Sequence, residues 1–324
     1  MAAGSHPRLI FMGTPDFGVP TLRHLAQAGF PVAAVVTGPD KPQGRGYQTS
    51  FSPVKRAAQE LGAKILQPSQ VNEPAVVEQL RELRADVLVV AAYGQILKAP
   101  LLTLAPLGAV NLHASLLPKY RGAAPIQWAI IRGETETGVT VQRMAERVDS
   151  GDILVQDKTA IHPDQTAADL FARLSALGGP LMAQALDLLA REGRRAGTPQ
   201  DESQATFAPR LSREDGHLDW TQTALELHNR VRGVQPWPGA YTEAAGETLK
   251  ILLTKPGGQK VSPSTPAGSI LKVEHKGGWL VAAGQGTTLH VLQVQCENSR
   301  QMTAQAFTCG YRVGPGSVLG LKGE

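Results

Sequence analysis

Short, uninterrupted apolar runs alternate with amphipathic stretches through the first third of the chain. The runs at Arg8–Gly13, Val32–Gly38 and Ala85–Gly94 lack polar–apolar alternation, which predicts strands buried on both faces. Between these runs, apolar residues recur at helical spacing in Phe17–Ala28 and in Glu73–Arg84. Strands and helices in alternation predict an α/β fold with a mostly parallel, Rossmann-like sheet.

The pattern continues with further strand and helix signals. Ser52–Pro53 is a helix N-cap followed by proline at the first helical position. Ala109–His113 is predicted to be a strand and Pro125–Arg132 a helix. Gln165–Ala190 is predicted to be one long helix that its internal Gly-Gly-Pro should break or bend.

The character of the chain changes after a polar, turn-rich segment at Arg191–Thr206. Beyond it, short apolar runs are separated by Gly and Pro, which predicts an all-β domain, either a sandwich or a small barrel. A short helix is expected before these runs, at Leu225–Val231. We therefore expect a catalytic domain at residues 7–190, a linker at 191–206 and a second domain at 207–324.

Composition narrows the class of protein. The chain has 324 residues, 42% of them hydrophobic and 19% charged, with a net charge of +4, which suits folded domains and permits a polyanionic partner. Cys296 and Cys309 belong to no Cys/His cluster, so we expect no zinc site and a reducing cytosol. The chain start lacks the apolar core of a secretory signal, and no apolar run reaches the ~20 residues that span a bilayer.

Asn111 and His113 stand at the end of an otherwise apolar strand. Because residues i and i+2 of a strand face the same side, the amide and the imidazole project together. Open α/β sheets bind ligands at the carboxyl ends of their strands, so this pair is a candidate site. A single histidine at a strand end is more often structural, but two polar groups on one face must both find partners.

Three further stretches each allow two interpretations. Asp149 lies in a turn between two expected strands and either orients His113 or serves the turn alone. The basic, glycine-rich loop Asp40–Gly46 is either solvated or reaches for phosphate. The turn at Phe11–Gly18 has Pro15 where a dinucleotide-binding motif needs glycine, which argues against a nicotinamide cofactor and for a tight strand-to-helix turn.

Several stretches together resemble the methionyl-tRNA formyltransferase family. They are GTPDFGVPTL, PDKPQGRG with SPVK, NLHASLLPKYRGAAPIQWAI, VDSGDIL, TFAPRLSREDGHLDW and QPWPGAY. N-x-H, S-L-L-P and D-x-G mark the wider group of 10-formyltetrahydrofolate-dependent formyltransferases. The GRG loop, GAAPIQ and PWPGA narrow the resemblance to the enzymes that act on tRNA.

The resemblance implies a formyltransferase domain followed by a C-terminal β-barrel similar to the OB fold. It also implies transfer of a formyl group from 10-formyltetrahydrofolate to the α-amine of methionine on initiator tRNA, for translation initiation. We expect a cytoplasmic monomer that binds no membrane and needs no metal. The residues that the resemblance assigns are Asn111, His113 and Asp149 for catalysis, Ser115, Leu116, Leu117 and Pro118 for folate binding, and Arg45 for tRNA binding.

Two alternatives stay open at the level of sequence. A sibling enzyme would formylate an amino-sugar nucleotide or glycinamide ribonucleotide with the same three catalytic residues. A non-catalytic RNA-binding protein would use the barrel alone, but it leaves the set of Asn111, His113 and Asp149 unexplained.

Overall fold

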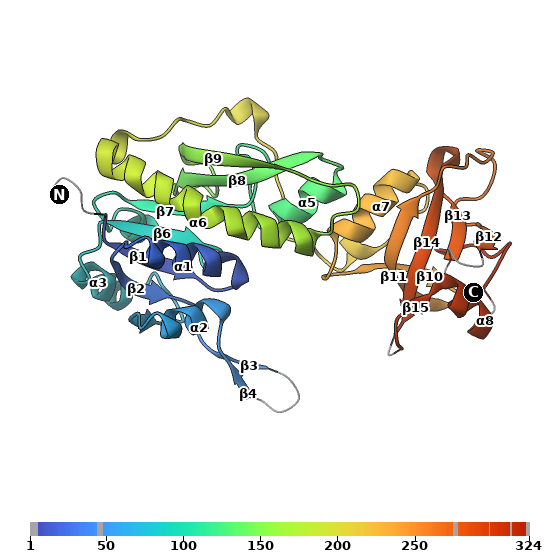
Figure 1. Ribbon diagram of the computed structural model, residues 1–324, viewed down its shortest axis with the longest axis horizontal. Coiled ribbons are helices and arrows are strands. Elements are labelled where there is room, and N and C mark those ends of the chain that lie inside the picture. The colour runs from blue at the N-terminus through green and yellow to red at the C-terminus, as the bar shows by residue number, and fades with distance from the viewer. Residues whose placement is uncertain (1–5, 44–47, 275–277, 298, 312, 322–324) are drawn as a thin grey trace. The chain divides into compact units, whose positions relative to one another are not determined.

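The computed structural model describes residues 6–43, 48–274, 278–297, 299–311 and 313–321 of the chain (Figure 1). The chain divides into two compact units. The first consists of Met1–Pro125, Glu136–Thr159 and Phe171–Ala208, and the second of Ile126–Thr135, Ala160–Leu170 and Pro209–Glu324. The residues expected to form the linker therefore lie in the first unit, and the predicted domain boundaries stay a prediction.

The first unit is built on a seven-stranded sheet in the order β5-β2-β1-β6-β7-β8-β9. Neighbouring strands from β5 to β7 are parallel, and β8 is antiparallel to β7. The predicted α/β class with a mostly parallel sheet is confirmed. The strands are β1 (Leu9–Gly13), β2 (Val32–Val36), β5 (Ile65–Leu66), β6 (Val87–Ala91), β7 (Ala109–His113), β8 (Glu136–Arg143) and β9 (Ile153–Ala160).

Helices connect these strands, as the alternating pattern predicts. Ser52 caps α2 through a 3.0 Å hydrogen bond that its hydroxyl accepts from the backbone N–H of Lys55. Gly13 ends β1 in a tight turn, where a Cβ would lie 2.8 Å from the carbonyl oxygen of Ala91. The connecting helices are α1 (Val19–Gln27), α2 (Pro53–Glu60), α3 (Pro74–Glu82), α4 (Ala99–Leu102) and α5 (Pro125–Ile131), the last of which belongs almost wholly to the second unit. The longest helix, α6 (Ala167–Glu192), follows β9.

The expected break of the long helix is wrong, because α6 is one continuous helix through Gly178, Gly179 and Pro180. The alternative, a bend at this triplet, stays a prediction. A Cβ on Gly178 would lie 2.3 Å from Leu112 Cδ2, and one on Gly179 would lie 2.6 Å from His24 Cβ. The two glycines thus let α6 approach the sheet and α1 closely. Leu174, before the triplet, and Leu181 and Met182, after it, are buried, and their packing offsets the backbone hydrogen bond that Pro180 cannot make.

The stretch predicted to be a loop after β2 contains a two-stranded antiparallel hairpin (Figure 1). Its strands are β3 (Lys41–Gln43) and β4 (Gln48–Ser50). Polar residues and glycine give no strand signal here, because the sequence of this stretch has no alternating apolar positions. Arg45, the predicted tRNA-binding residue, lies outside the described residues.

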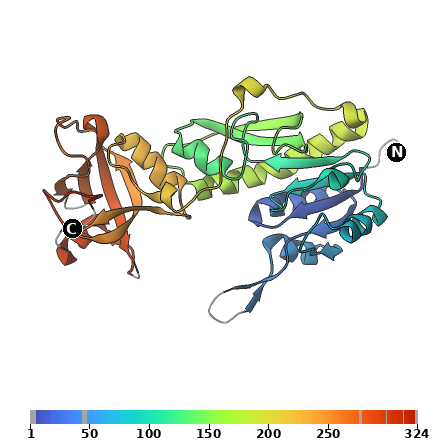
Figure 2. The same ribbon diagram turned by 180° about the vertical axis from the view of Figure 1, so that it is seen from behind.

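The second unit contains an antiparallel sheet in the order β10-β11-β14-β13-β12, with β15 beside β14. This part of the chain is coloured orange to red in Figure 2. This confirms the predicted C-terminal all-β domain. The expected helix is α7 (Ala224–Gly233), which begins with a capping box formed by Thr223 and Glu226. The remaining elements are β10 (Ala240–Ala244), β11 (Glu247–Pro256), β12 (Ile270–Glu274), β13 (Gly278–Ala282), β14 (Thr288–Cys296), β15 (Met302–Thr303) and α8 (Ala304–Gly310).

Within the described residues, no helix has both the length and the apolar content that a membrane crossing requires.

Candidate active site

The polar pair lies at the carboxyl end of β7, between β6 and β8. Asn111 pairs with Gln142 of β8 and His113 pairs with Thr140, in antiparallel register. On its other side, Asn111 pairs with Val90 of β6 in parallel register. His113 is buried and Asn111 is half-buried, so the two side chains occupy the sheet edge where ligands of open α/β folds bind.

Both ring nitrogens of His113 face oxygen acceptors. Nε2 lies 2.9 Å from the carbonyl oxygen of Tyr120, and Nδ1 lies 3.5 Å from Asp149 Oδ2. A neutral imidazole carries one proton and can donate to one of these acceptors, whereas the protonated ring can donate to both. These surroundings suit a ring that takes up and releases a proton.

Asp149 lies in the turn between β8 and β9 and completes the set. Its Oδ2 accepts a 2.9 Å hydrogen bond from the backbone N–H of Gly122, and its Oδ1 accepts one of 2.8 Å from Gln142 Nε2. Asn111 Nδ2 lies 3.5 Å from Oδ1. The structure therefore brings the three predicted catalytic side chains together, with the Asp149 side chain 10% exposed.

Two amide side chains extend this arrangement, and sequence reasoning identified neither. Gln200 Nε2 lies 3.1 Å from Gln142 Oε1, 2.9 Å from the carbonyl oxygen of Asp149 and 2.7 Å from that of Gly151. Gln142 carried a usable signal, because a polar residue in an apolar strand needs a buried partner. The polar segment that contains Gln200 offers no pattern by which it could have been found.

The ion pair between Arg121 and Glu202 holds the side-chain amide of Gln200. Gln200 Oε1 accepts hydrogen bonds from Arg121 Nε at 3.1 Å and from Nη2 at 2.8 Å. Arg121 is 2% exposed and also donates two hydrogen bonds to Glu202, at 2.9 and 3.1 Å. Hydrogen bonds from Arg121 and then from Arg147 lower the pKa of the Glu202 carboxyl to about 2. A charged pair thus fixes which end of the Gln200 amide faces Asp149.

The segment after β7, predicted to contact folate, is tied to the protein by hydrogen bonds. Ser115 Oγ donates to the carbonyl oxygen four residues along the chain, at 2.6 Å. Gln156 Nε2 donates to the carbonyl oxygen of Leu117 at 2.9 Å. Ser115 and Leu117 are buried, whereas Leu116 and Pro118 are half-buried. Of the four predicted residues, Leu116 and Pro118 have side-chain surface left for a ligand.

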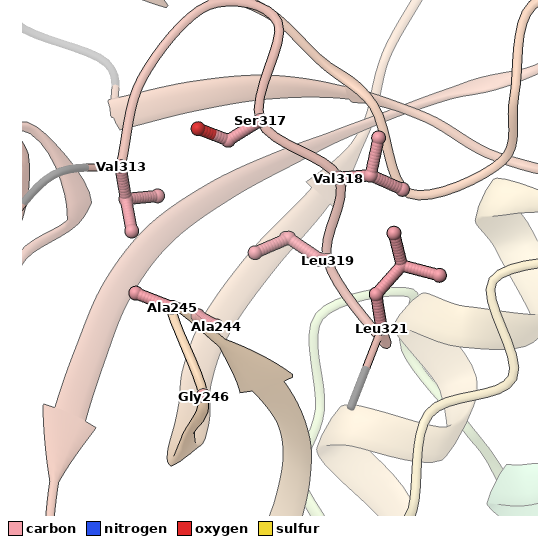
Figure 3. A pocket seen from close by; sticks show the side chains of 8 residues that line it. All are labelled: Ala244, Ala245, Gly246, Val313, Ser317, Val318, Leu319 and Leu321. Carbon is pink, nitrogen blue, oxygen red and sulfur yellow. The ribbon is translucent and has the colours of Figure 1, made fainter. Parts of the chain in front are cut away.

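Two other features of the described part of the chain carry no comparable chemistry. No three His, Cys, Asp or Glu side chains gather there as metal ligands. A pocket in the second unit is lined by side chains of which only Ser317 is polar and none is ionisable (Figure 3). The pocket is lined by Ala244, Ala245, Gly246, Val313, Ser317, Val318, Leu319 and Leu321.

Two family models match the chain. The model "Formyl transferase" matches residues 7–186, and "Formyl transferase, C-terminal domain" matches residues 210–312. The match boundaries fall close to the two ends of the polar segment that follows α6.

Known proteins are similar over nearly the full length. The methionyl-tRNA formyltransferase of Solibacter usitatus is 47% identical over 317 residues, which are 97% of this chain and 98% of the relative. That of Acetivibrio thermocellus is 44% identical over 97% of this chain and 99% of the relative. A solved N-formyltransferase from Helicobacter canadensis has a similar fold, with a TM-score of 0.66 at 18% identity over 87% of this chain and 98% of its own.

Proposed function

The chain belongs to the methionyl-tRNA formyltransferase family, and from this premise we infer that it transfers a formyl group to methionine on initiator tRNA. We propose that Asn111, His113 and Asp149 carry out the transfer. Their convergence at the end of β7 is the observation that carries this proposal. Identity over nearly the whole length of both relatives disfavours a sibling that formylates an amino-sugar nucleotide or glycinamide ribonucleotide.

The formyl donor of the family is a folate, and we propose 10-formyltetrahydrofolate for this chain. Leu116 and Pro118 keep exposed surface beside the strand end. Ile96, in the loop after β6, is 70% exposed, and Val148, next to Asp149, is 58% exposed. Exposed apolar side chains at a ligand-binding sheet edge suit a flat aromatic ring. The Helicobacter canadensis N-formyltransferase was solved in complex with folinic acid, which supports a folate as the class of donor.

The transfer needs proton movement and a donor for a developing negative charge. The amine nitrogen of methionine forms a bond to the formyl carbon, and the bond from that carbon to the folate nitrogen breaks. Asn111 Nδ2 can donate a hydrogen bond to the carbonyl oxygen as it gains charge. His113 accepts the proton of the attacking amine and returns it to the leaving nitrogen. Asp149 orients the His113 ring and balances its charge when it is protonated.

For the tRNA we propose a contact through Arg45, between β3 and β4. The hairpin follows β2, whose carboxyl end lies at the same edge of the parallel sheet as the end of β7. An arginine can hold a phosphate by two parallel hydrogen bonds, which would guide the acceptor end towards the site.

Formylation assays with competing acceptors test this function. The purified chain is supplied with 10-formyltetrahydrofolate and with methionine-charged initiator tRNA, methionine-charged elongator tRNA, a dTDP-linked amino sugar or glycinamide ribonucleotide. We expect formylation of the initiator tRNA, with the same rate in the presence of EDTA. Preferential formylation of either small acceptor would overturn the assignment, and so would binding of tRNA without consumption of the formyl donor.

A further inference from the structure

The segment that follows α6 is bound along its length to the loop that holds the candidate site. Backbone hydrogen bonds join Arg121 N to Thr206 O at 2.8 Å and Ala208 N to Arg121 O at 2.8 Å. The Thr206 hydroxyl accepts a 2.9 Å hydrogen bond from Tyr120 N. These contacts fix the loop whose Tyr120 carbonyl faces His113 and whose Gly122 N–H donates to Asp149.

Gln200 is the member of this segment that reaches the Asp149 turn itself. Its amide is held in one orientation, because Arg121 offers only donors and the carbonyl groups of Asp149 and Gly151 offer only acceptors. The oxygen must therefore face Arg121 and the nitrogen must face the turn. This orientation sets the next amide too, since Gln142 Oε1 faces Gln200 Nε2.

In the hydrogen bonds that lead from Gln200 through Gln142 to the Asp149 carboxylate, each donor faces an acceptor. With its oxygen directed to Gln200, Gln142 presents Nε2 to Asp149 Oδ1 at 2.8 Å. Gln142 is 1% exposed, so its amide is shielded from bulk water. Gln200 thus acts on Asp149 twice, through the backbone of the turn and through the side chain of Gln142.

We propose that Gln200 is a positioning residue for formyl transfer, which holds the Asp149 carboxylate in place through the turn and through Gln142. This inference rests on the proposed role of Asp149 in formyl transfer. Because the hydrogen bonds of the Gln200 side chain go to Arg121, Gln142 and the Asp149 turn, we expect its loss to affect the turnover number and to leave both Michaelis constants nearly unchanged. Misplacing a reacting group by about 1 Å can cost roughly 10²-fold in rate.

Two substitutions of similar size separate the hydrogen bonds of Gln200 from its volume. Gln200→Met keeps the length of the side chain without hydrogen bonding. Gln200→Glu keeps the bonds from Arg121 but directs an acceptor at the carbonyl groups of Asp149 and Gly151. We expect kcat to fall about 10- to 100-fold in both variants, with KM for 10-formyltetrahydrofolate and initiator tRNA within about 2-fold of wild type.

Gln204→Met is the matched control, because Gln204 is exposed in the same segment and its amide bonds only to Asp201 in the described structure. It should retain the wild-type kcat. Thermal midpoints of all variants show whether the fold survives. If Gln200→Glu does not fold, Gln200→Met carries the test alone.

A double-mutant cycle with Asp149→Asn distinguishes positioning from a general structural effect. Single-turnover rates are measured with enzyme in excess, so that slow variants stay measurable. If Gln200 acts through Asp149, adding Gln200→Met to Asp149→Asn should lower the rate less than about 3-fold further. Independent, multiplying losses would overturn the inference, as would a normal kcat in both Gln200 variants. A wild-type chain without formyl transfer would instead contradict the proposed function.

Discussion

Asp149 and Gly151 each occupy a backbone position that restricts which residue can stand there. Asp149 has a φ of 53°, in the left-handed region that aspartate tolerates better than most residues. A Cβ on Gly151 would lie 1.9 Å from the carbonyl oxygen of Arg143, so only glycine lets the turn close against β8. The D-S-G turn is therefore determined by its backbone, and its carboxylate is directed to the end of β7.

Glu202→Gln should remove a pH-dependent part of the stability. Hydrogen bonds from Arg121 and Arg147 lower the pKa of Glu202 from 4.5 to about 2. Because the folded-state pKa is depressed, the ionised carboxylate stabilises the fold fully above pH 4.5, and this contribution is lost as the pH falls towards 2. We expect the variant to have a lower urea midpoint than the wild type near neutral pH, by a small margin since Glu202 is largely exposed.

The two midpoints should converge as the pH approaches about 2. A difference that stays constant between pH 4.5 and 2 would show that the ionisation of Glu202 does not matter for stability.

Sequence reasoning could predict the strand-end pair of Asn111 and His113, because alternation along one strand places both on one face. For Asp149 it left two interpretations open, a role in orienting His113 and a role in the turn alone, because the same turn pattern also occurs at positions without a function. Gln142 carried a signal that sequence reasoning left unused, because it is a polar residue within an apolar strand. Gln200 was missed because its partners, Arg121, Gln142 and the Asp149 turn, come from distant parts of the chain and leave no local pattern.

The glycines of α6 show how an element can contradict its local signal. Alanine normally stabilises a helix relative to glycine by about 1 kcal/mol. Here a Cβ would meet Leu112 at Gly178 and His24 at Gly179, and overpacking costs roughly 1–3 kcal/mol. We expect Gly178→Ala and Gly179→Ala to lower the urea midpoint. Gly179→Ala should have the larger effect, because His24 Cβ is fixed to the main chain whereas Leu112 Cδ2 ends a flexible side chain.

Gln184→Ala, at an exposed position of the same helix, is the control and should leave the midpoint nearly unchanged. Higher stability of both glycine variants would mean that α6 does not pack as closely as the structure indicates.

The β3–β4 hairpin is proposed to serve one substrate only. Arg45→Ala should depress formylation of initiator tRNA and leave the affinity for a folate analogue unchanged. Arg45→Lys should restore little of the formylation of initiator tRNA, because lysine offers a point charge in place of two parallel hydrogen bonds. Lys64→Ala removes an exposed basic residue elsewhere in the first unit and should have little effect. An equal loss of folate-analogue binding in Arg45→Ala would place the hairpin at the folate instead.

At the scale of the whole molecule, the sequence predicted the class of both sheets correctly. Buried apolar runs identify central strands wherever they occur, and these runs determine the class. Short elements such as β10, β15 and α8 were not predicted, because they have too few residues to show a periodic pattern of apolar positions. The division into two units made of separated segments could not be predicted either, because it depends on contacts between distant residues. The expected monomeric state and cytoplasmic location stay predictions.

The most direct test of the proposed mechanism separates catalysis from binding in His113→Ala and Asn111→Ala. Single-turnover formylation of initiator tRNA is measured together with equilibrium binding of the same tRNA and of a folate analogue. General acid–base catalysis contributes roughly 10²–10⁴-fold, so His113→Ala should lose most of its rate while binding both substrates nearly as the wild type does. Asn111→Ala should behave similarly, since it lacks the donor to the charged oxygen. A near-normal rate in His113→Ala would contradict the mechanism, because the transfer would then proceed without the residue at its centre.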